Sequence, residues 1–147
     1  MKFSQQQVEM VTLDIVNKLG DVFKWRWEEQ RHALLTEFAR DKKDIGLQVL
    51  RASFTDEWDK KTIKKAPKSL KQQLGTLTKL NKKQLLFTRP ASQDQPALLA
   101  IWWPWEHGGT FSLRLVILSE SYDLPDIAKS NFFWPKFLQN FFKKTSV

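Results

Sequence analysis

Two apolar runs joined by a short polar turn, over residues 97–119, constrain the fold of this chain more than any other feature. The stretch reads ALLAIWWPWEHGGTFSLRLVILS. Gly108 and Gly109 can adopt the positive φ that tight hairpin turns require, because glycine has no Cβ. After the turn, every second residue from Phe111 onward is apolar, as in a β-strand. The stretch therefore predicts a β-hairpin.

Both runs of this hairpin are too apolar for a sheet that leaves one face in water. Before the turn, apolar residues occupy both alternating sets, so that Trp102 falls on one face and Trp103 and Trp105 fall on the other. Such a strand needs cover on both faces, or it offers one face to a partner. Pro104 cannot donate to a ladder and marks a strand end, an edge or a bulge. The pattern does not decide which face is buried.

A third strand is expected immediately before the hairpin. Residues 84–89 read QLLFTR and are closed by Pro90, and a short polar link leads from there into the first apolar run. Two strands alone are only marginally stable in water, so a third is needed. We therefore expect a three-stranded antiparallel meander.

Helical patterns are expected at the N-terminal side of this sheet. Ser4 and Gln7 form a capping-box pattern before a helix over residues 5–19, which Gly20 would end. Asp21 could cap a second helix, and the two would form a helical hairpin. The apolar stripe of that second helix is expected to comprise Trp27, Leu34, Leu35 and Phe38.

Three further segments complete the expected architecture. Residues 44–58 fit either a helix or a strand, with the helix favoured, and a short helix with Pro67 in its first turn should end at Gly75. Aromatic residues at helical spacing over residues 131–144 predict a C-terminal amphipathic helix packed on the sheet, or alternatively an interface helix. The chain is thus expected to be one α+β domain over residues 1–147.

Composition is typical of a folded protein. The chain is 41% hydrophobic and 27% charged, and it contains no cysteine, which excludes disulfides and thiolate metal sites. No apolar run approaches the roughly 20 residues of a membrane span, and the first residues lack a signal-peptide core. We therefore expect a cytoplasmic protein without a membrane span.

Positive charge is concentrated in one segment of the chain. Between residues 60 and 89 there are ten basic residues and no acidic residue, so that this segment carries +10, whereas the whole chain carries +8. A field of this kind attracts polyanions or acidic protein surfaces. The basic residues are Lys60, Lys61, Lys64, Lys65, Lys68, Lys71, Lys79, Lys82, Lys83 and Arg89.

The leading functional hypothesis is non-enzymatic binding of single-stranded or double-stranded nucleic acid. The basic run would neutralise phosphates, Trp102, Trp103 and Trp105 would stack on bases, and Arg114 would assist. Each feature also has a purely structural interpretation, since lysines often only solvate a surface and tryptophans often only fill a core. The hypothesis requires the lysines and the exposed indoles to share one neighbourhood.

Two alternatives use the same residues differently. The chain could be a small adaptor that docks an acidic protein surface, or a homodimer formed through an aromatic surface. It could also be a metal-independent ribonuclease. Neither a phosphate-binding glycine loop nor a nucleophile elbow is present, and His32 and His107 are isolated from other metal ligands. No catalytic residue, metal or cofactor is therefore assigned, and a non-enzymatic function is favoured.

Overall fold

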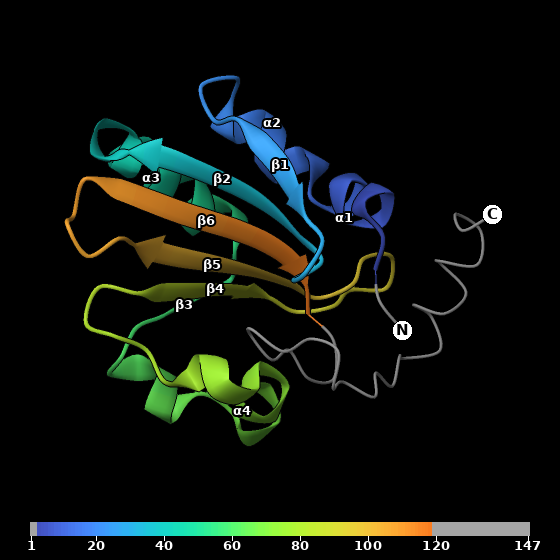
Figure 1. Ribbon diagram of the computed structural model, residues 1–147. Coiled ribbons are helices and arrows are strands. Elements are labelled where there is room, and N and C mark those ends of the chain that lie inside the picture. Colours follow the sequence, from blue (N-terminus) through green and yellow to red (C-terminus); the bar gives the residue numbers. More distant parts are fainter. Residues whose placement is uncertain (1–2, 119–147) are drawn as a thin grey trace.

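The computed structural model describes residues 3–118, which form a six-stranded sheet with helices on both faces (Figure 1). The strands lie in the order β1-β2-β6-β5-β4-β3, and every neighbouring pair is antiparallel. The strands span β1 (Trp25–Glu28), β2 (Ala33–Ala39), β3 (Asp56–Trp58), β4 (Leu85–Arg89), β5 (Leu98–Pro104) and β6 (Thr110–Ile117).

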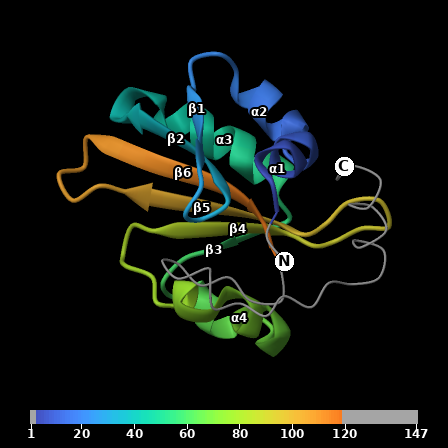
Figure 2. The same ribbon diagram turned by 45° about the vertical axis from the view of Figure 1, so that its right-hand side comes forward.

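Three helices lie on one face of the sheet, and the fourth lies on the other (Figures 1 and 2). The first face carries α1 (Gln5–Val11), α2 (Leu13–Leu19) and α3 (Lys43–Ser53). The second face carries α4 (Lys68–Leu74), flanked by the 3-10 turns η2 (Thr62–Lys65) and η3 (Gly75–Thr78). A further turn, η1 (Arg40–Lys42), leads from β2 into α3.

This arrangement creates two hydrophobic cores, one on each side of the sheet. Ala100 and Trp102 of β5 pack into the core beneath α1, α2 and α3. The alternate residues Leu99 and Ile101 pack into the core beneath α4 and its flanking turns. The expectation that a strand apolar on both faces needs cover on both faces is therefore confirmed.

The predicted hairpin is present as β5 and β6. Gly108 has a φ of 78°, and its N–H donates to the Trp105 carbonyl across the turn at 2.9 Å. The Trp105 N–H in turn donates to the Thr110 carbonyl at 2.9 Å. The strand expected at residues 84–89 is β4, which pairs with β5.

The predicted three-stranded meander with an N-terminal helical hairpin is wrong. The sheet has six strands, and the segment expected to form a second helix is the β1–β2 hairpin. Leu34 and Phe38 are four residues apart, a spacing that places them on one face of a strand as well as of a helix. The turn between the strands has no glycine, and His32 takes the left-handed conformation with a φ of 49°.

The expected first helix is divided into two shorter ones. Its capping box is present, since the Ser4 hydroxyl accepts the Gln7 N–H and the Gln7 side chain accepts the Ser4 N–H. A break at Thr12 separates α1 from α2, and the Thr12 hydroxyl donates to the Val8 carbonyl at 2.7 Å. Both helices therefore fall within the single stretch where one was expected.

The remaining segments are partly as expected. Residues 44–58 form most of α3 and then β3, so the favoured helix is present but ends at Ser53, and α4 follows Pro67 as predicted. The predicted C-terminal amphipathic helix is not part of the observed architecture, because residues 119–147 lie outside the described residues. No helix in the described part is long and apolar enough to cross a membrane.

Candidate functional site

Nine of the basic residues predicted as a site lie together on the face of the sheet that α4 covers. We call this layer, residues 60–83, the lysine cap. Buried Ile63, Leu74 and Leu77 hold it against the second core. Its lysines are all exposed except Lys71, which is partly buried, and they comprise Lys60, Lys61, Lys64, Lys65, Lys68, Lys71, Lys79, Lys82 and Lys83.

The local sequence explains why the cap is built from short turns. Pro67 precedes the first residue of α4, where its fixed φ and missing N–H cost nothing. Gly75 ends the helix with a φ of 59°, a conformation that glycine adopts readily. Because the turns are short and each contributes few apolar anchors, most lysine side chains project away from the core.

Within residues 3–118, the positive charge of the lysine cap has no acidic partner. No cap lysine forms an ion pair with an acidic side chain of residues 3–118. Lys71 instead donates to the Lys64 carbonyl. Asp59, at the entry of the cap, accepts backbone N–H groups from Lys61 at 2.9 Å and Thr62 at 2.8 Å. The hydrogen bond from Thr62 is the main cause of its lowered pKa.

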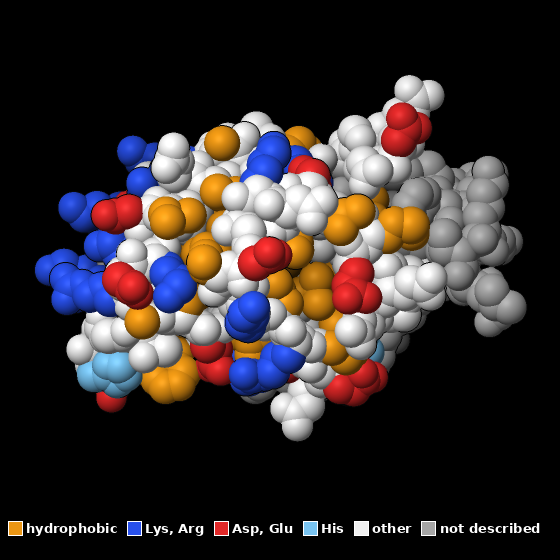
Figure 3. Space-filling model, turned by 90° about the horizontal axis from the view of Figure 1, so that it is seen from above, with side chains coloured by type: hydrophobic (Ala, Val, Ile, Leu, Met, Phe, Trp, Pro, Cys, Tyr) orange, Lys and Arg blue, Asp and Glu red, His pale blue; other side chains and the backbone are white. Residues whose placement is uncertain are grey.

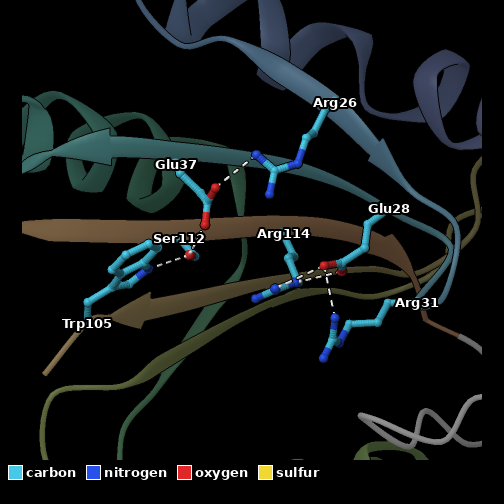
Figure 4. A network of polar contacts seen from close by, with 7 residues as sticks. All are labelled: Arg26, Glu28, Arg31, Glu37, Trp105, Ser112 and Arg114. Atoms are coloured by element: carbon cyan, nitrogen blue, oxygen red, sulfur yellow. Dashed lines mark hydrogen bonds and ion pairs between the residues drawn. The ribbon is translucent and has the colours of Figure 1, made fainter.

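The two arginines predicted to join this site lie elsewhere and are already paired. Arg89 contacts Asp14 of α2 at 3.2 Å. Arg114 binds both oxygens of Glu28, at 2.8 and 3.1 Å, and Arg31 binds the same carboxylate at 2.9 Å (Figure 4). Neither Arg89 nor Arg114 therefore offers an unpaired charge beside the lysine cap.

The cluster formed by Glu28, Arg31 and Arg114 is largely enclosed, and the pKa of the Glu28 carboxylate is lowered. The side chains of Arg114 and Glu28 are only 14% and 15% exposed. Burial by itself would raise the pKa of Glu28, but the hydrogen bonds and charges of Arg114 and Arg31 outweigh burial and lower it. Glu37 nearby binds Arg26 at 2.8 Å and contacts Ser112, so this part of the sheet face is a network of paired charges (Figure 4).

The three hairpin tryptophans have different environments. Trp102 is only 2% exposed and packs between Phe38 and Phe111 on the face opposite the lysine cap. Trp103 is half-buried against the second core. Trp105 is 43% exposed, and its indole N–H donates to the Ser112 hydroxyl at 2.8 Å. Of these three rings, Trp105 is therefore the one available for stacking.

Trp105 lies at the end of the sheet that the last cap lysines also reach. The β5–β6 turn, the loop before β4 and the connection from β2 to α3 come together there (Figures 1 and 2). Lys83 of the loop borders the same hollow as Pro104 and Gly108 of the hairpin. The structure thus brings one exposed indole near one end of the cap, rather than three indoles beside its centre.

Known proteins give no independent guide to this site. No family model, curated protein or solved structure matches the chain. The interpretation of the lysine cap therefore depends on its charge, its exposure and its aromatic neighbour.

The described residues contain no arrangement typical of a metal-dependent or histidine-based enzyme. Residues 3–118 include no group of three potential metal ligands. His32 lies in the β1–β2 turn, where its Nδ1 is 3.1 Å from the Phe3 carbonyl, whereas His107 lies at the opposite end of the sheet. His107 accepts the Gly109 N–H in its own turn at 3.0 Å. These two histidines therefore cannot act as an acid–base pair on one substrate.

Proposed function

We propose that this chain binds nucleic acid through the lysine cap and carries out no reaction on it. The observation that carries the proposal is a set of exposed lysines that form no ion pair with an acidic side chain in the described part of the chain, residues 3–118. Such lysines repel one another unless a polyanion or salt screens them. Phosphates would relieve this repulsion and release their condensed counterions, which is the main source of affinity for a nucleic-acid backbone.

The structure supports a narrower version of the site than the sequence suggested. Phosphate contacts would come from the lysine cap, without Arg89 and Arg114, whose charges are paired. Stacking would be limited to Trp105, because Trp102 is enclosed in the opposite core. Binding dominated by phosphates should depend strongly on salt and weakly on base sequence.

Fluorescence anisotropy with a labelled oligonucleotide of about 20 nucleotides tests this proposal. Single-stranded DNA, single-stranded RNA and duplex DNA would each be titrated at several salt concentrations. We expect affinity to fall steeply with salt for all three. Lys64→Gln combined with Lys68→Gln should lower the log–log salt slope by about one for each lysine that contacts a phosphate.

A charge-matched variant controls for the loss of net positive charge. Lys18 and Lys24 are exposed and lie outside the cap. Lys18→Gln combined with Lys24→Gln should leave the salt slope unchanged. If both double variants lowered the salt slope equally, the effect would be one of net charge alone and would contradict a site at the lysine cap. Undetectable binding at low salt would overturn the proposal.

The same titrations distinguish nucleic acid from an acidic protein partner. Polyglutamate supplies carboxylates at high density but offers neither phosphates nor bases. We favour nucleic acid because Trp105 supplies a stacking ring near the cap. If polyglutamate displaces the oligonucleotide when both are present at the same concentration of negative charges, the result would instead support the acidic-protein alternative. Cleavage of the RNA during the titration would contradict the absence of catalysis.

A further inference from the structure

A cavity lies at one end of the sheet, on the face that carries α1, α2 and α3. The lysine cap covers the opposite face. The cavity has a volume of about 360 Å³ and opens between α3, the β5–β6 turn and the loop before β4. Small-molecule sites commonly measure from about 300 to about 1,000 Å³, so this cavity is large enough for a small ligand. None of the sequence-predicted functions makes use of it.

The floor of the cavity is apolar and aromatic. Trp102 and Phe111 line it with their rings 5.3 Å apart between centroids, and Leu47 of α3 completes the wall. Gly46 allows α3 to approach this closely, because a Cβ there would lie 3.1 Å from the Trp102 ring. Both rings are themselves buried, with Trp102 2% and Phe111 6% exposed, and they are tilted by 46° to each other. The apolar surface open to a ligand is therefore supplied mainly by the half-buried side chains of Leu47, Leu85 and Pro104.

The rim of the cavity is cationic. Arg40, Lys43 and Lys83 line it, and no described carboxylate does. None of these three cations forms an ion pair with residues 3–118. Asp41 lies beside them in sequence but pairs with Lys42 at 3.8 Å. Lys and Arg side chains gather at this end of the surface (Figure 3).

We propose that this cavity binds a small organic anion with an apolar body, such as a carboxylate, sulfonate or phosphate. The side chains of Leu47, Leu85 and Pro104 would contact the apolar body. Arg40, Lys43 and Lys83 would surround the acidic group, since three cations without a carboxylate favour a ligand of opposite charge. Lys83 also belongs to the lysine cap, but Arg40 and Lys43 lie outside it, so that variants of these two residues test the cavity separately from nucleic-acid binding.

Anilinonaphthalene sulfonate, whose fluorescence rises in apolar surroundings, is a suitable probe. We expect one saturable site with a Kd on the order of tens of micromolar for a ligand of this size. Naphthoate and dodecanoate should both displace the probe, and uncharged dodecanol should not displace it. Failure of both acids to displace the probe would overturn the apolar part of the proposal, and displacement by dodecanol would overturn the ionic part.

Three double variants test whether the cationic rim binds the acidic group of the ligand. Arg40→Gln combined with Lys43→Gln should weaken probe binding by about tenfold for each charge removed. Lys18→Gln combined with Lys24→Gln changes net charge equally but lies away from the cavity, and it should bind as the unaltered protein does. The lysine-cap variant Lys64→Gln with Lys68→Gln should also bind normally, which separates this test from the nucleic-acid test.

A spectroscopic readout locates the apolar body. The indole N–H resonance of Trp102 can be assigned by its loss in Trp102→Phe, and it should shift as naphthoate is added. Leu47→Trp would fill the cavity and should abolish both the shift and the probe signal, with its fold checked by circular dichroism. An unmoved Trp102 resonance at saturation, or unchanged probe affinity in Arg40→Gln with Lys43→Gln, would overturn the proposal.

Discussion

Two buried threonines of the sheet differ in whether their hydroxyl groups have a partner. Thr88 of β4 accepts the Trp58 indole N–H at 2.9 Å. Thr36 of β2 is fully buried, and its hydroxyl forms no hydrogen bond within the described residues. The indole N–H of its cross-strand partner Trp25 is also buried and has no hydrogen-bond partner in the described part of the chain. The Thr36 hydroxyl therefore contributes a desolvation cost without a compensating bond.

We expect Thr36→Val to raise the free energy of unfolding by about 1 kcal/mol, because valine has the same shape without the hydroxyl. Thr88→Val is the matched control and should lower it by about 1–2 kcal/mol, since Trp58 loses its acceptor. Urea denaturation measures the free energy of unfolding of both variants. A destabilised Thr36→Val protein would show that the hydroxyl is paired in solution, for example to a buried water.

A second prediction concerns the Glu28 carboxylate and pH. Its lowered pKa means that the folded state favours the ionised form, so this group stabilises the fold above its ordinary pKa. That contribution is lost as pH falls through the lowered folded-state pKa. We expect Glu28→Gln to cost on the order of 2–4 kcal/mol at neutral pH, because Arg114 and Arg31 lose a largely enclosed partner.

The difference in free energy of unfolding between the Glu28→Gln variant and the unaltered protein should become smaller as the solution is acidified. Urea denaturation at several pH values measures it. An exposed pair provides the comparison, since Arg89 and Asp14 are more accessible and Asp14→Asn should cost less than about 1 kcal/mol. A Glu28→Gln difference that stays constant with pH would contradict the assigned direction of the pKa change.

At the scale of the elements, the lysine cap depends on α4. This helix has seven residues and is too short to be stable alone, so its fully buried Leu74 must hold it to the sheet. We expect Leu74→Ala to cost about 3 kcal/mol and to increase hydrogen exchange across residues 68–78. Leu70→Ala, at a half-buried position on the same helix, should cost less. Equal costs would contradict this anchoring role of Leu74.

The elements also show which sequence signals were decisive and which were not. The β5–β6 hairpin was predictable because Gly108 and Gly109 mark its turn and apolar residues alternate from Phe111 onward in β6. The β1–β2 hairpin was missed because its turn has no glycine or proline and His32 supplies the positive φ instead. The alternation of Trp25 and Trp27, both packed on the first core, was the available signal.

The site was predictable from the sequence only in part. The exposure of the basic run followed from its composition, because a cluster of lysines is rarely buried. The burial of Trp102 did not, since both faces of β5 are apolar and tertiary packing alone decides which ring is enclosed. The cavity lined by Arg40 and Lys43 was also missed, because only the tertiary fold brings these residues beside Gly108 and Phe111 of the β5–β6 hairpin.

At the scale of the whole molecule, unbalanced charge should make stability depend on salt. The chain carries +8, and the cap lysines are unpaired within residues 3–118. Raising salt from about 10 mM to about 100 mM shortens the screening length from about 30 Å to about 10 Å. We expect Tm to rise by a few degrees over this range, measured by circular dichroism.

Charge reversal in the lysine cap provides the control for this prediction. Lys64→Glu combined with Lys68→Glu should raise Tm at low salt and flatten its dependence on salt, because it removes like-charge repulsion. A Tm that falls with added salt would show that attractive ion pairs such as Glu28–Arg114 dominate the balance instead.

The strand order also has a consequence for how the chain is made. The last of the described strands, β6, lies between β2 and β5, so no strand pairing joins the β1–β2 pair to β3, β4 and β5 until residues 110–117 have been synthesised. A nascent chain shorter than this holds two separate groups of strands, each with an open hydrogen-bonding edge. Such edges invite pairing between neighbouring nascent chains, so a ribosomal pause before residue 110 would expose the protein to aggregation.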